Sequence, residues 1–381
     1  MRNKFVVVTH AVLSGSEDIA GPAHNIVSYL DRKKTEYLFI RHSLFAGDQT
    51  LLSSRKGGKV SSSRLNSSLR FGEIVNRVSE GYRTVKSVSQ FSKKRPSVYI
   101  GIDPLNSFWG LVLKKMGKVS TLISFTVDYS PNRFQSRLLN KIYHLIDRVT
   151  LRFSDKAWVV SKRIYDLRLA QGKNPNDIVL VPNAPSVSEV KSLIKKKADS
   201  MNIITIGTIS SAINFKVVVD SIGEVRKRFP NVKLTIIGQG QGMMDLKKEI
   251  ERLGLTQNVF LVGSKTHDEV FKILSSQGIG IAMYTDDAPW SYYSDSMKAR
   301  DYLALGLPVI ISGNIGTADE IKNEKAGILI KNEKEDLVKA IERLLKDSTY
   351  YEELRENALR LARENDIEKI LDKALREESL Q

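Results

Sequence analysis

The sequence of 381 residues contains no cysteine. This absence excludes disulfides, thiolate metal sites and cysteine nucleophiles, and it fits a reducing compartment. Long apolar runs are also missing, because the run near the start covers only Phe5 to Val8 and no later stretch approaches the roughly 18 apolar residues of a membrane span. We therefore expect neither a signal peptide nor a transmembrane helix, and a cytoplasmic protein.

Metal and nucleophile motifs are equally scarce. The histidines show no HxxxH or HxH spacing, so we expect no metal site; they are His10, His24, His42, His144 and His267. There is no GxSxG elbow and no Walker lysine, which excludes α/β-hydrolase and P-loop chemistry. His10 ends the first predicted strand and is either a substrate contact or a structural histidine.

Acidic residues are few in the N-terminal half. Met1 to Pro185 hold 30 Lys and Arg against 13 Asp and Glu, whereas the remainder holds 29 against 30. Residues 52–97 contain eleven basic residues but only two acids, Glu73 and Glu80. Such a segment is expected to seek anionic surfaces.

Apolar residues within this basic segment recur at loosely helical spacing; they are Leu65, Leu69, Ile74, Val78, Val85 and Val88. The pattern suits a helix that lies on an anionic membrane, with a peripheral position at its inner face. The alternatives are a solvated basic face beside an acceptor site and a nucleic-acid surface. Nucleic acid is disfavoured because only Phe71, Tyr82 and Phe91 supply aromatic rings for stacking.

Length and composition predict two globular domains of ordinary size. Strand candidates alternate with helical stretches, which predicts parallel sheets. In the first half they are 4–9, 37–40, 97–100, 121–125 and 157–160, and in the second half 202–206, 233–237, 259–262, 278–283, 309–311 and 327–330. Each half is therefore predicted to be a doubly wound α/β domain.

The boundary is predicted at 181–185, where two prolines within five residues favour an extended connector. This gives an N-terminal domain over 1–183 and a C-terminal domain over 184–363. The tail at 364–381 is predicted to form a helix that packs back on the N-terminal domain.

A glycine-rich loop, Gly238-Gln239-Gly240-Gln241-Gly242, directly follows the predicted strand at 233–237. Glycines there let a backbone approach phosphate. The spacing is not that of the dinucleotide fingerprint and no acid follows at the ribose distance, so an NAD site is disfavoured. A tight strand-to-helix turn explains the loop equally well.

The most informative stretch runs from Tyr292 to Ile310. Ser294, Asp295 and Ser296 are predicted to cap a helix that begins near Met297, which leaves first-turn amides for an anion such as a diphosphate. Lys298 adds a positive charge there, and Asp301, one turn further, can accept hydrogen bonds from a ribose. Trp290, Tyr292 and Tyr293 either stack on a sugar or base or form a partly buried cluster.

In this stretch the sequence resembles the GT-B glycosyltransferases, and most of all the retaining glycosyltransferases of family 4. The resemblance covers the C-terminal half through VPNA, IGTISSAINFK, LTIIGQGQG and SDSMKARDYLALGLPVII. It implies two facing Rossmann-like domains with the active site in the cleft between them. It also implies that no metal and no cofactor is needed, the nucleotide sugar being a substrate.

The resemblance assigns roles to single residues. Asp301 matches the second acid of the E-x7-E motif, which binds the donor ribose, whereas Tyr293 stands where the first acid is expected. Lys216 matches the lysine that holds the diphosphate. Gly207 and Gly238 match the donor-side glycines, and Thr208 replaces the usual arginine, a contact that Lys298 can supply.

The N-terminal half matches less closely. Gly21 matches the glycine loop that faces the diphosphate, with Ala20 in place of the other glycine. Asp128 follows a strand where similar enzymes place a catalytic His or Asp, and Asp103 ends a neighbouring strand. Either carboxylate contacts the acceptor or the transferring sugar, or it is only a helix cap.

These features predict a hexosyl- or other glycosyltransferase of polysaccharide biosynthesis. It would move a sugar from a nucleoside-diphosphate sugar to a hydroxyl of a glycan or lipid-linked glycan, with retention. The alternatives are a nucleotide-sugar epimerase of the same fold and a degenerate protein that binds nucleotide sugars without cleaving them. The departures at Tyr293 and Thr208 favour the last of these.

Overall fold

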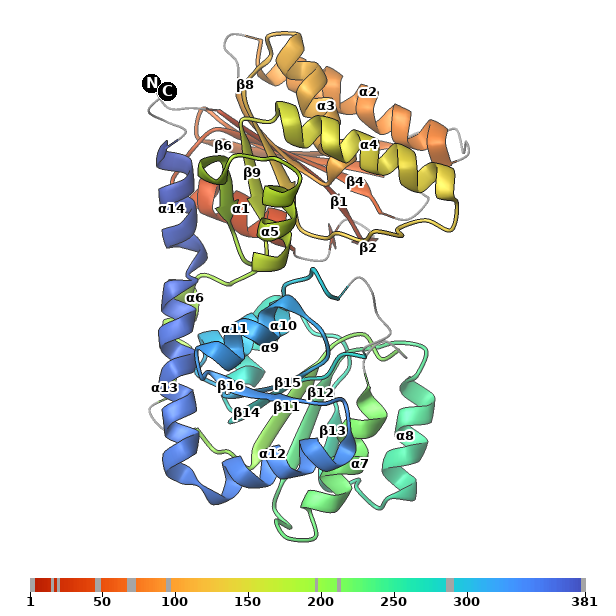
Figure 1. Cartoon of the computed structure of the whole chain (residues 1–381). Coiled ribbons are helices and arrows are strands. Elements are labelled where there is room, and N and C mark those ends of the chain that lie inside the picture. The colour runs from red at the N-terminus through yellow and green to blue at the C-terminus, as the bar shows by residue number, and fades with distance from the viewer. Residues whose placement is uncertain are drawn as a thin grey trace. The chain divides into compact units, whose positions relative to one another are not determined.

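The computed structural model describes residues 4–14, 17–18, 21–44, 49–66, 73–93, 97–195, 198–210, 214–285 and 291–377. The chain divides into two compact units. The first comprises Met1–Pro182 together with Glu368–Gln381, and the second comprises Asn183–Ile367. Each unit is an α/β domain built on its own sheet (Figure 1).

The first unit is built on one mixed sheet. Its strands are β1 (Phe5–Ala11), β4 (Tyr37–Ser43), β5 (Gln49–Lys56), β6 (Lys59–Asn66), β7 (Ser97–Ile102), β8 (Val119–Thr126), β9 (Lys156–Val159) and β10 (Ile178–Leu180), beside a short pair β2 (Leu13–Ser14) and β3 (Glu17–Asp18). The order in the sheet is β10-β9-β8-β7-β1-β4-β5-β6. All pairings are parallel except those of β4 with β5 and of β5 with β6.

Helices cover both faces of this sheet. They are α1 (Pro22–Arg32), α2 (Glu73–Phe91), α3 (Pro104–Lys115), α4 (Arg137–Phe153), α5 (Lys162–Ala170) and α14 (Ile367–Glu377), with a 3-10 turn at Pro175–Asp177. Figure 1 shows α2, α3 and α4 as one layer on one face, with α1 and α5 on the other. α14 is joined to α1 because Tyr29 Oη donates to Asp372 at 2.5 Å and Arg32 pairs with Glu368 at 2.8 Å.

The structure corrects the helical interpretation of the basic segment. Residues 49–66 form a β-hairpin instead of a helix, and Leu65 lies on β6 opposite Thr50. The turn is Gly57-Gly58, and both residues have positive φ (57° and 80°), the conformation that two-residue hairpin turns favour. Leu69 lies outside the described residues. α2 alone is helical, and its Val88 is buried in the core.

The second unit has a fully parallel sheet in the order β13-β12-β11-β14-β15-β16. Its strands are β11 (Asn202–Ile206), β12 (Lys233–Ile237), β13 (Val259–Leu261), β14 (Ile279–Ala282), β15 (Val309–Ser312) and β16 (Gly327–Ile330). The helices are α6 (Val187–Val190), α7 (Phe215–Val225), α8 (Met243–Arg252), α9 (His267–Leu274), α10 (Met297–Ala304), α11 (Gly316–Asn323), α12 (Lys334–Lys346) and α13 (Ser348–Glu364), with a 3-10 turn at Lys191–Leu193.

Two apolar cores lie on opposite faces of this second sheet. One packs α7, α8 and α12 against the strands, and the other packs α9, α10, α11 and α13. Strand residues such as Ile203 and Ile204 are fully buried and point into the two different cores. Each fully buried side chain of this size contributes roughly 1.5–3 kcal/mol, so apolar burial stabilises the sheet on both of its faces.

Candidate functional site

The loops after β11 and β12 meet at the carboxyl-end edge of the second sheet. Gly207 has φ 157° and Gly238 has φ 150°. A Cβ atom on Gly238 would lie only 1.9 Å from the carbonyl oxygen of Gly207, and one on Gly240 only 2.2 Å from that of Ile209. The packing of loop against loop therefore requires glycine at 238 and 240, whether or not a phosphate also approaches them.

Backbone hydrogen bonds fasten these two loops together. Ile209 N–H donates to the Gln239 carbonyl at 2.9 Å, and Gly242 N–H donates to the Ile209 carbonyl at 3.1 Å. This is the tight strand-to-helix turn that the sequence offered as one interpretation of the glycine-rich loop. These hydrogen bonds hold the two loops against each other at the edge of the sheet.

The predicted cap of α10 is confirmed, and the capping residue is Ser296. Its Oγ accepts from the Ala299 N–H at 3.2 Å and also bonds the Tyr284 hydroxyl at 2.6 Å. The Ser296 N–H donates to Thr317 Oγ1 at 2.7 Å. The next amides, of Met297 and Lys298, belong to the first turn and have no acceptor within the helix, so they face an anion if one binds there.

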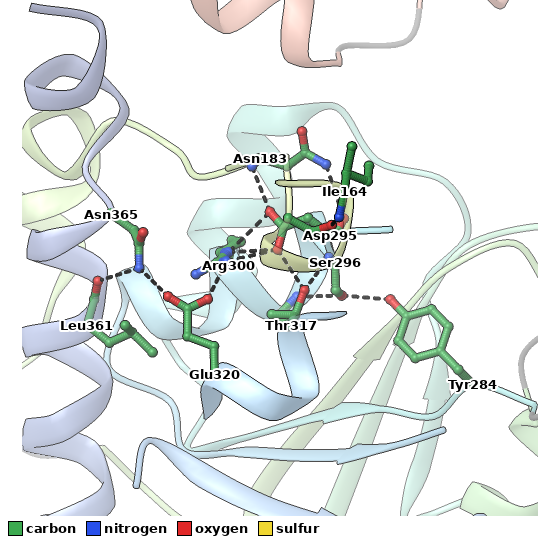
Figure 2. Close-up of polar contacts among 12 residues, drawn as sticks. Ile164, Asn183, Tyr284, Asp295, Ser296, Arg300, Thr317, Glu320, Leu361 and Asn365 are labelled. Carbon is green, nitrogen blue, oxygen red and sulfur yellow. Dashed lines mark hydrogen bonds and ion pairs between the residues drawn. The ribbon is translucent and has the colours of Figure 1, made fainter. Parts of the chain in front are cut away.

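Asp295 is the centre of a buried polar network before this helix (Figure 2). Its carboxylate accepts from the Asn183 N–H at 2.7 Å and from Thr317 Oγ1 at 2.7 Å, and it pairs with Arg300 Nη2 at 2.9 Å. The Asp295 and Arg300 side chains are only 1% and 5% exposed. Asp295, which the sequence placed among donor-binding residues, is thus occupied in holding the loop and the first turn of α10 in position.

Arg300 extends this network to α11 and α13. Its Nη2 donates to Glu320 Oε2 at 2.5 Å, and the other oxygen of Glu320 accepts from Asn365 Nδ2 at 2.8 Å (Figure 2). No role was predicted from the sequence for Arg300, Thr317 or Tyr284. Their partners include residues distant in sequence, so no local pattern marks them.

Lys298 has a buried and unpartnered ammonium group. Its Nζ is inaccessible to solvent and has no hydrogen-bond partner within the described part of the chain. It lies 4.4 Å from the centroid of the Tyr284 ring, whose π face offers weak compensation. Burial lowers the pKa of Lys298 to about 7. An anion beside it would restore the charged form, as expected for a phosphate-binding lysine.

Asp301 follows Lys298 by one helical turn. The residue is partly exposed, yet its carboxyl group is poorly solvated, and burial raises the pKa of Asp301 to about 8. Its side chain makes no hydrogen bond or ion pair with any described residue. At neutral pH the group is largely protonated, so it can both donate to and accept from a diol such as a ribose.

Tyr293 and Ser294 border this turn. Tyr293 packs edge-to-face on Tyr292 with ring centroids 4.8 Å apart, and the Ser294 N–H donates to the Ser291 carbonyl at 3.0 Å. Tyr292 is 41% exposed, which leaves an aromatic face accessible. Trp290 lies outside the described residues.

Lys216 is not joined to the residues around α10. It is 65% exposed at the start of α7 and pairs with Glu249 at 2.7 Å and with Asp220 at 3.2 Å. These hydrogen bonds, first to Glu249 and then to Asp220, raise the pKa of Lys216. The diphosphate-binding role that the resemblance implies for Lys216 therefore requires these surface ion pairs to open.

The first unit brings both candidate carboxylates together. Asp103 and Asp128 follow the adjacent strands β7 and β8. Asp128 pairs with Arg133 at 3.3 Å, and one of its oxygens is buried without a partner among the described residues. Burial raises the pKa of Asp128; Arg133 opposes that rise, and the like charge of Asp103 adds to it.

Asp103 has a strained backbone. Its φ of 77° and ψ of 154° lie in a region that residues other than glycine rarely adopt. It occupies the N-cap position of α3, yet its side chain makes no capping hydrogen bond. The carboxylate instead lies 3.9 Å from His10 Nδ1. Capping therefore does not explain why an aspartate stands here.

His10 belongs to a satisfied polar cluster. Its Nε2 bonds Glu80 Oε2 at 3.0 Å, and its Nδ1 lies 3.1 Å from Asn106 Nδ2. Although burial works against ionisation, the hydrogen bond to His10 holds the pKa of Glu80 below its usual value. Glu80, which the sequence marks only as an acid within a basic segment, thus orients His10.

Gly21 is the N-cap residue of α1, and its N–H donates to His24 Nδ1 at 3.0 Å. A Cβ atom added at Gly21 would meet nothing within 4 Å, so this glycine borders open space. Ala20 lies outside the described residues.

Two classes of site receive no support from the described residues. No group of three or more His, Cys, Asp or Glu side chains within that part of the chain is arranged to hold a metal ion. No helix among the same residues is long and apolar enough to cross a membrane.

The second unit is similar in sequence to a known protein family. Residues 189–361 match the family described as glycosyl transferases group 1. This range includes the glycine loops, most of the Asp295 network, Lys298 and Asp301. The match therefore lies within the second unit.

Curated relatives are similar mainly over part of the chain. The phosphatidylinositol N-acetylglucosaminyltransferase subunit of Arabidopsis thaliana is 22% identical over 178 residues, 46% of this chain and 38% of that protein. The alpha-monoglucosyldiacylglycerol synthase of Streptococcus pneumoniae is 26% identical over 156 residues, 41% of this chain and 34% of that protein. The chain thus spans between about a third and a half of the length of the curated relatives it matches.

Solved structures share the fold over nearly the whole chain. HepE of Anabaena in complex with UDP-glucose matches with a TM-score of 0.70 at 13% identity and full coverage of both chains. WaaG, a glycosyltransferase involved in lipopolysaccharide biosynthesis, matches with a TM-score of 0.64 at 15% identity, over 97% of this chain and 98% of that one. The chain therefore has the predicted α/β fold of two Rossmann-like domains, as GT-B glycosyltransferases do.

Proposed function

We propose that this protein is a glycosyltransferase that moves a sugar from a nucleoside-diphosphate sugar to a hydroxyl group. The observation that carries the proposal is the first turn of α10. There the Ser296 cap, the buried unpartnered Nζ of Lys298 and the carboxyl of Asp301 lie within one and a half turns, inside the glycosyl transferases group 1 domain. The diphosphate would bind the first-turn amides and Lys298, and the ribose would bind Asp301.

The chemistry assigned to this turn is stabilisation of the leaving group. The bond between the anomeric carbon and the diphosphate oxygen breaks, and negative charge collects on the diphosphate. A preorganised cation and helix amides lower the barrier most when that charge develops. A lysine with a pKa of about 7 becomes fully charged when the anion binds. The positive charge of Lys298 is therefore present mainly in the complex, where it stabilises the leaving group.

The acceptor side of the proposal rests on the first unit. Asp128, with its raised pKa and unpartnered oxygen, is the preferred contact to the acceptor hydroxyl or the transferring sugar. Asp103 is the alternative, and its strained backbone is a feature that proteins retain mainly at functional sites.

The acceptor is proposed to be a glycan or a lipid-linked glycan. Two curated relatives have names that include a lipid, which supports a lipid-linked acceptor. They are the alpha-monoglucosyldiacylglycerol synthase and the phosphatidylinositol N-acetylglucosaminyltransferase subunit. Membership of family 4, retention at the anomeric carbon, a hexosyl donor and independence of metals and cofactors are also part of the proposal. Loss of activity in a chelator would contradict the metal-independent mechanism.

An anionic membrane as a partner of residues 52–97 stays a prediction, as does a cytoplasmic location. The exposed basic residues of the hairpin and of α2 support the membrane prediction. The burial of Val88 removes part of the apolar face on which that prediction depended.

A degenerate nucleotide-sugar-binding protein is the rival that one observation favours. Lys216, the lysine that the resemblance assigns to the diphosphate, is occupied by Glu249 and Asp220. An epimerase of the same fold is the remaining alternative, and it would convert its donor without any acceptor.

Turnover separates these functions. Wild type is incubated with UDP-, GDP-, dTDP- and ADP-sugars, with and without alkyl glycosides, and release of nucleoside diphosphate is followed. We expect release from one donor, faster with acceptor, and lost in Lys298→Met and Asp301→Ala. Lys227→Met, at an exposed lysine of the same unit, is the matched control and should behave as wild type. Binding without release in wild type would support the degenerate protein, and an epimeric nucleotide sugar would support the epimerase.

A further inference from the structure

α4 carries an exposed apolar stripe in the first unit. Five of its apolar side chains are 40–66% exposed, namely Leu138, Leu139, Ile142, Leu145 and Phe153. Five large apolar side chains exposed on one 17-residue helix form a patch of the kind that marks an interaction site.

The helix has three distinct faces. One packs into the first unit through Tyr143, Asp147, Thr150 and Leu151, all of which are buried. At about 100° per residue, Leu138, Ile142 and Leu145 fall within a sector about 60° wide on the outer surface. Stable packing within the unit therefore leaves this apolar sector facing solvent.

The third face is positively charged and borders the apolar one. Arg137, Lys141, Arg148 and Arg152 are exposed and occupy a neighbouring sector about 60° wide. Among the described residues none of these four forms an ion pair with a carboxylate. The acid of this helix, Asp147, is buried and neutralised by Arg168 at 2.6 Å.

We propose that α4 is a membrane-docking helix that lies in the interface of an anionic bilayer. Apolar side chains would enter the boundary of the acyl chains while the adjacent arginines and Lys141 bind lipid phosphates and carboxylates. Charge complementarity selects this occupant, because an apolar stripe flanked only by positive charge matches a negatively charged lipid surface. The inference concerns a helix of the first unit and does not depend on sugar transfer.

The neighbouring helix α2 provides a direct comparison. It also exposes apolar side chains, Val75, Val78 and Tyr82, at 48–66%. Both helices pack against α3 in the same layer (Figure 1). However, two cations of α2 are already engaged within the unit, because Arg77 pairs with Glu80 at 3.1 Å and Arg83 donates to Thr50 at 3.2 Å. α2 therefore offers lipid phosphates fewer available charges than α4 does.

The test is vesicle flotation of the full-length protein. Leu138→Ser, Ile142→Ser and Leu145→Ser are combined in one variant, and Val75→Ser, Val78→Ser and Tyr82→Ser in the matched variant of α2. On phosphatidylserine-containing vesicles we expect the α4 variant to bind at least about tenfold more weakly than wild type and the α2 variant to change far less. Thermal unfolding checks that both variants are folded, since all six side chains are exposed.

A second measurement locates the contact. Because the chain has no cysteine, Leu145→Cys and Met244→Cys each create one labelling site for an environment-sensitive fluorophore. Met244 is 65% exposed on the second unit and serves as the control. We expect a blue shift on anionic vesicles at position 145 only, weakened by replacing phosphatidylserine with phosphatidylcholine.

Three results would overturn the proposal. They are equal vesicle binding by wild type and the α4 variant, loss of binding in the α2 variant alone, and an unshifted fluorophore at position 145. A fourth result would assign the stripe to a second copy of the chain and would also overturn the proposal. In that case analytical ultracentrifugation shows that wild type forms a dimer and the α4 variant does not, and wild type does not bind vesicles.

Discussion

The Nζ of Lys298 lies 4.4 Å from the centroid of the Tyr284 ring and has no hydrogen-bond partner among the described residues. The same Tyr284 bonds Ser296, which caps the helix that carries Lys298. One aromatic residue thus links the cation to the helix N-terminus. An anion that binds the first turn would meet both.

Proton uptake should accompany nucleotide binding. Burial lowers the pKa of Lys298 to about 7, so at pH 8 the free protein holds this lysine largely neutral, and a bound diphosphate restores its charge. We expect about one proton to be taken up per bound nucleotide at pH 8. Calorimetric titrations in two buffers of different ionisation enthalpy measure this number. Lys298→Met should lose the uptake, whereas Lys227→Met should keep it.

Asp301 should make the unliganded protein less stable as the pH rises. Burial raises its pKa to about 8, so between about pH 4 and pH 8 the folded state keeps a proton that the unfolded chain releases. Stability falls across this window and levels off above pH 8. Because the residue is partly exposed, we expect wild type to lose about 2 kcal/mol relative to Asp301→Asn between pH 5 and pH 8. Urea unfolding of both proteins measures it, and parallel pH profiles would contradict the assignment.

Asp295→Asn should destabilise the second unit strongly. The change leaves Arg300 buried with its charge only partly compensated and weakens the contacts to Asn183 and Thr317. Breaking a buried pair in this way typically costs about 3–5 kcal/mol. Glu224→Gln, which removes the exposed partner of Lys227, is the control and should leave urea unfolding unchanged. A small effect of Asp295→Asn would mean that the network does not hold α10 in place.

Two substitutions at Asp103 can separate its effect on stability from its effect on activity. Asp103→Gly relieves the backbone strain at φ 77°, whereas Asp103→Ala keeps it. We expect the glycine variant to be about 1 kcal/mol more stable than the alanine variant. If Asp103 contacts substrate, both variants lose activity equally although their stabilities differ. Full activity in the stabilised glycine variant would assign the carboxylate no role in transfer.

Much of the fold could be predicted from the sequence. Short β-branched runs such as 202–206 and 233–237 match β11 and β12 because buried parallel strands are nearly continuous in apolar residues. The hairpin of β5 and β6 was missed because its serine-rich and basic strands lack apolar runs. The Gly57-Gly58 pair was the signal that could have revealed it.

The site could be predicted only in part. The cap at Ser296 follows from local sequence and was found. Packing decides the rest: the burial of Lys298, the pairing of Asp295 with Arg300 and the ion pairs of Lys216 all depend on how the unit packs. The strain at Asp103 has no sequence pattern, because only the surrounding structure imposes it.

A thermal-shift screen of wild type, Lys298→Met, Asp301→Ala and Lys227→Met against UDP, GDP, dTDP, ADP and their sugars tests the donor site most directly. The account predicts that one nucleoside diphosphate raises the melting temperature of wild type and Lys227→Met, and that the shift is lost in the other two variants. A shift that Lys298→Met and Asp301→Ala retain in full, or no shift in wild type with any nucleotide, would contradict it.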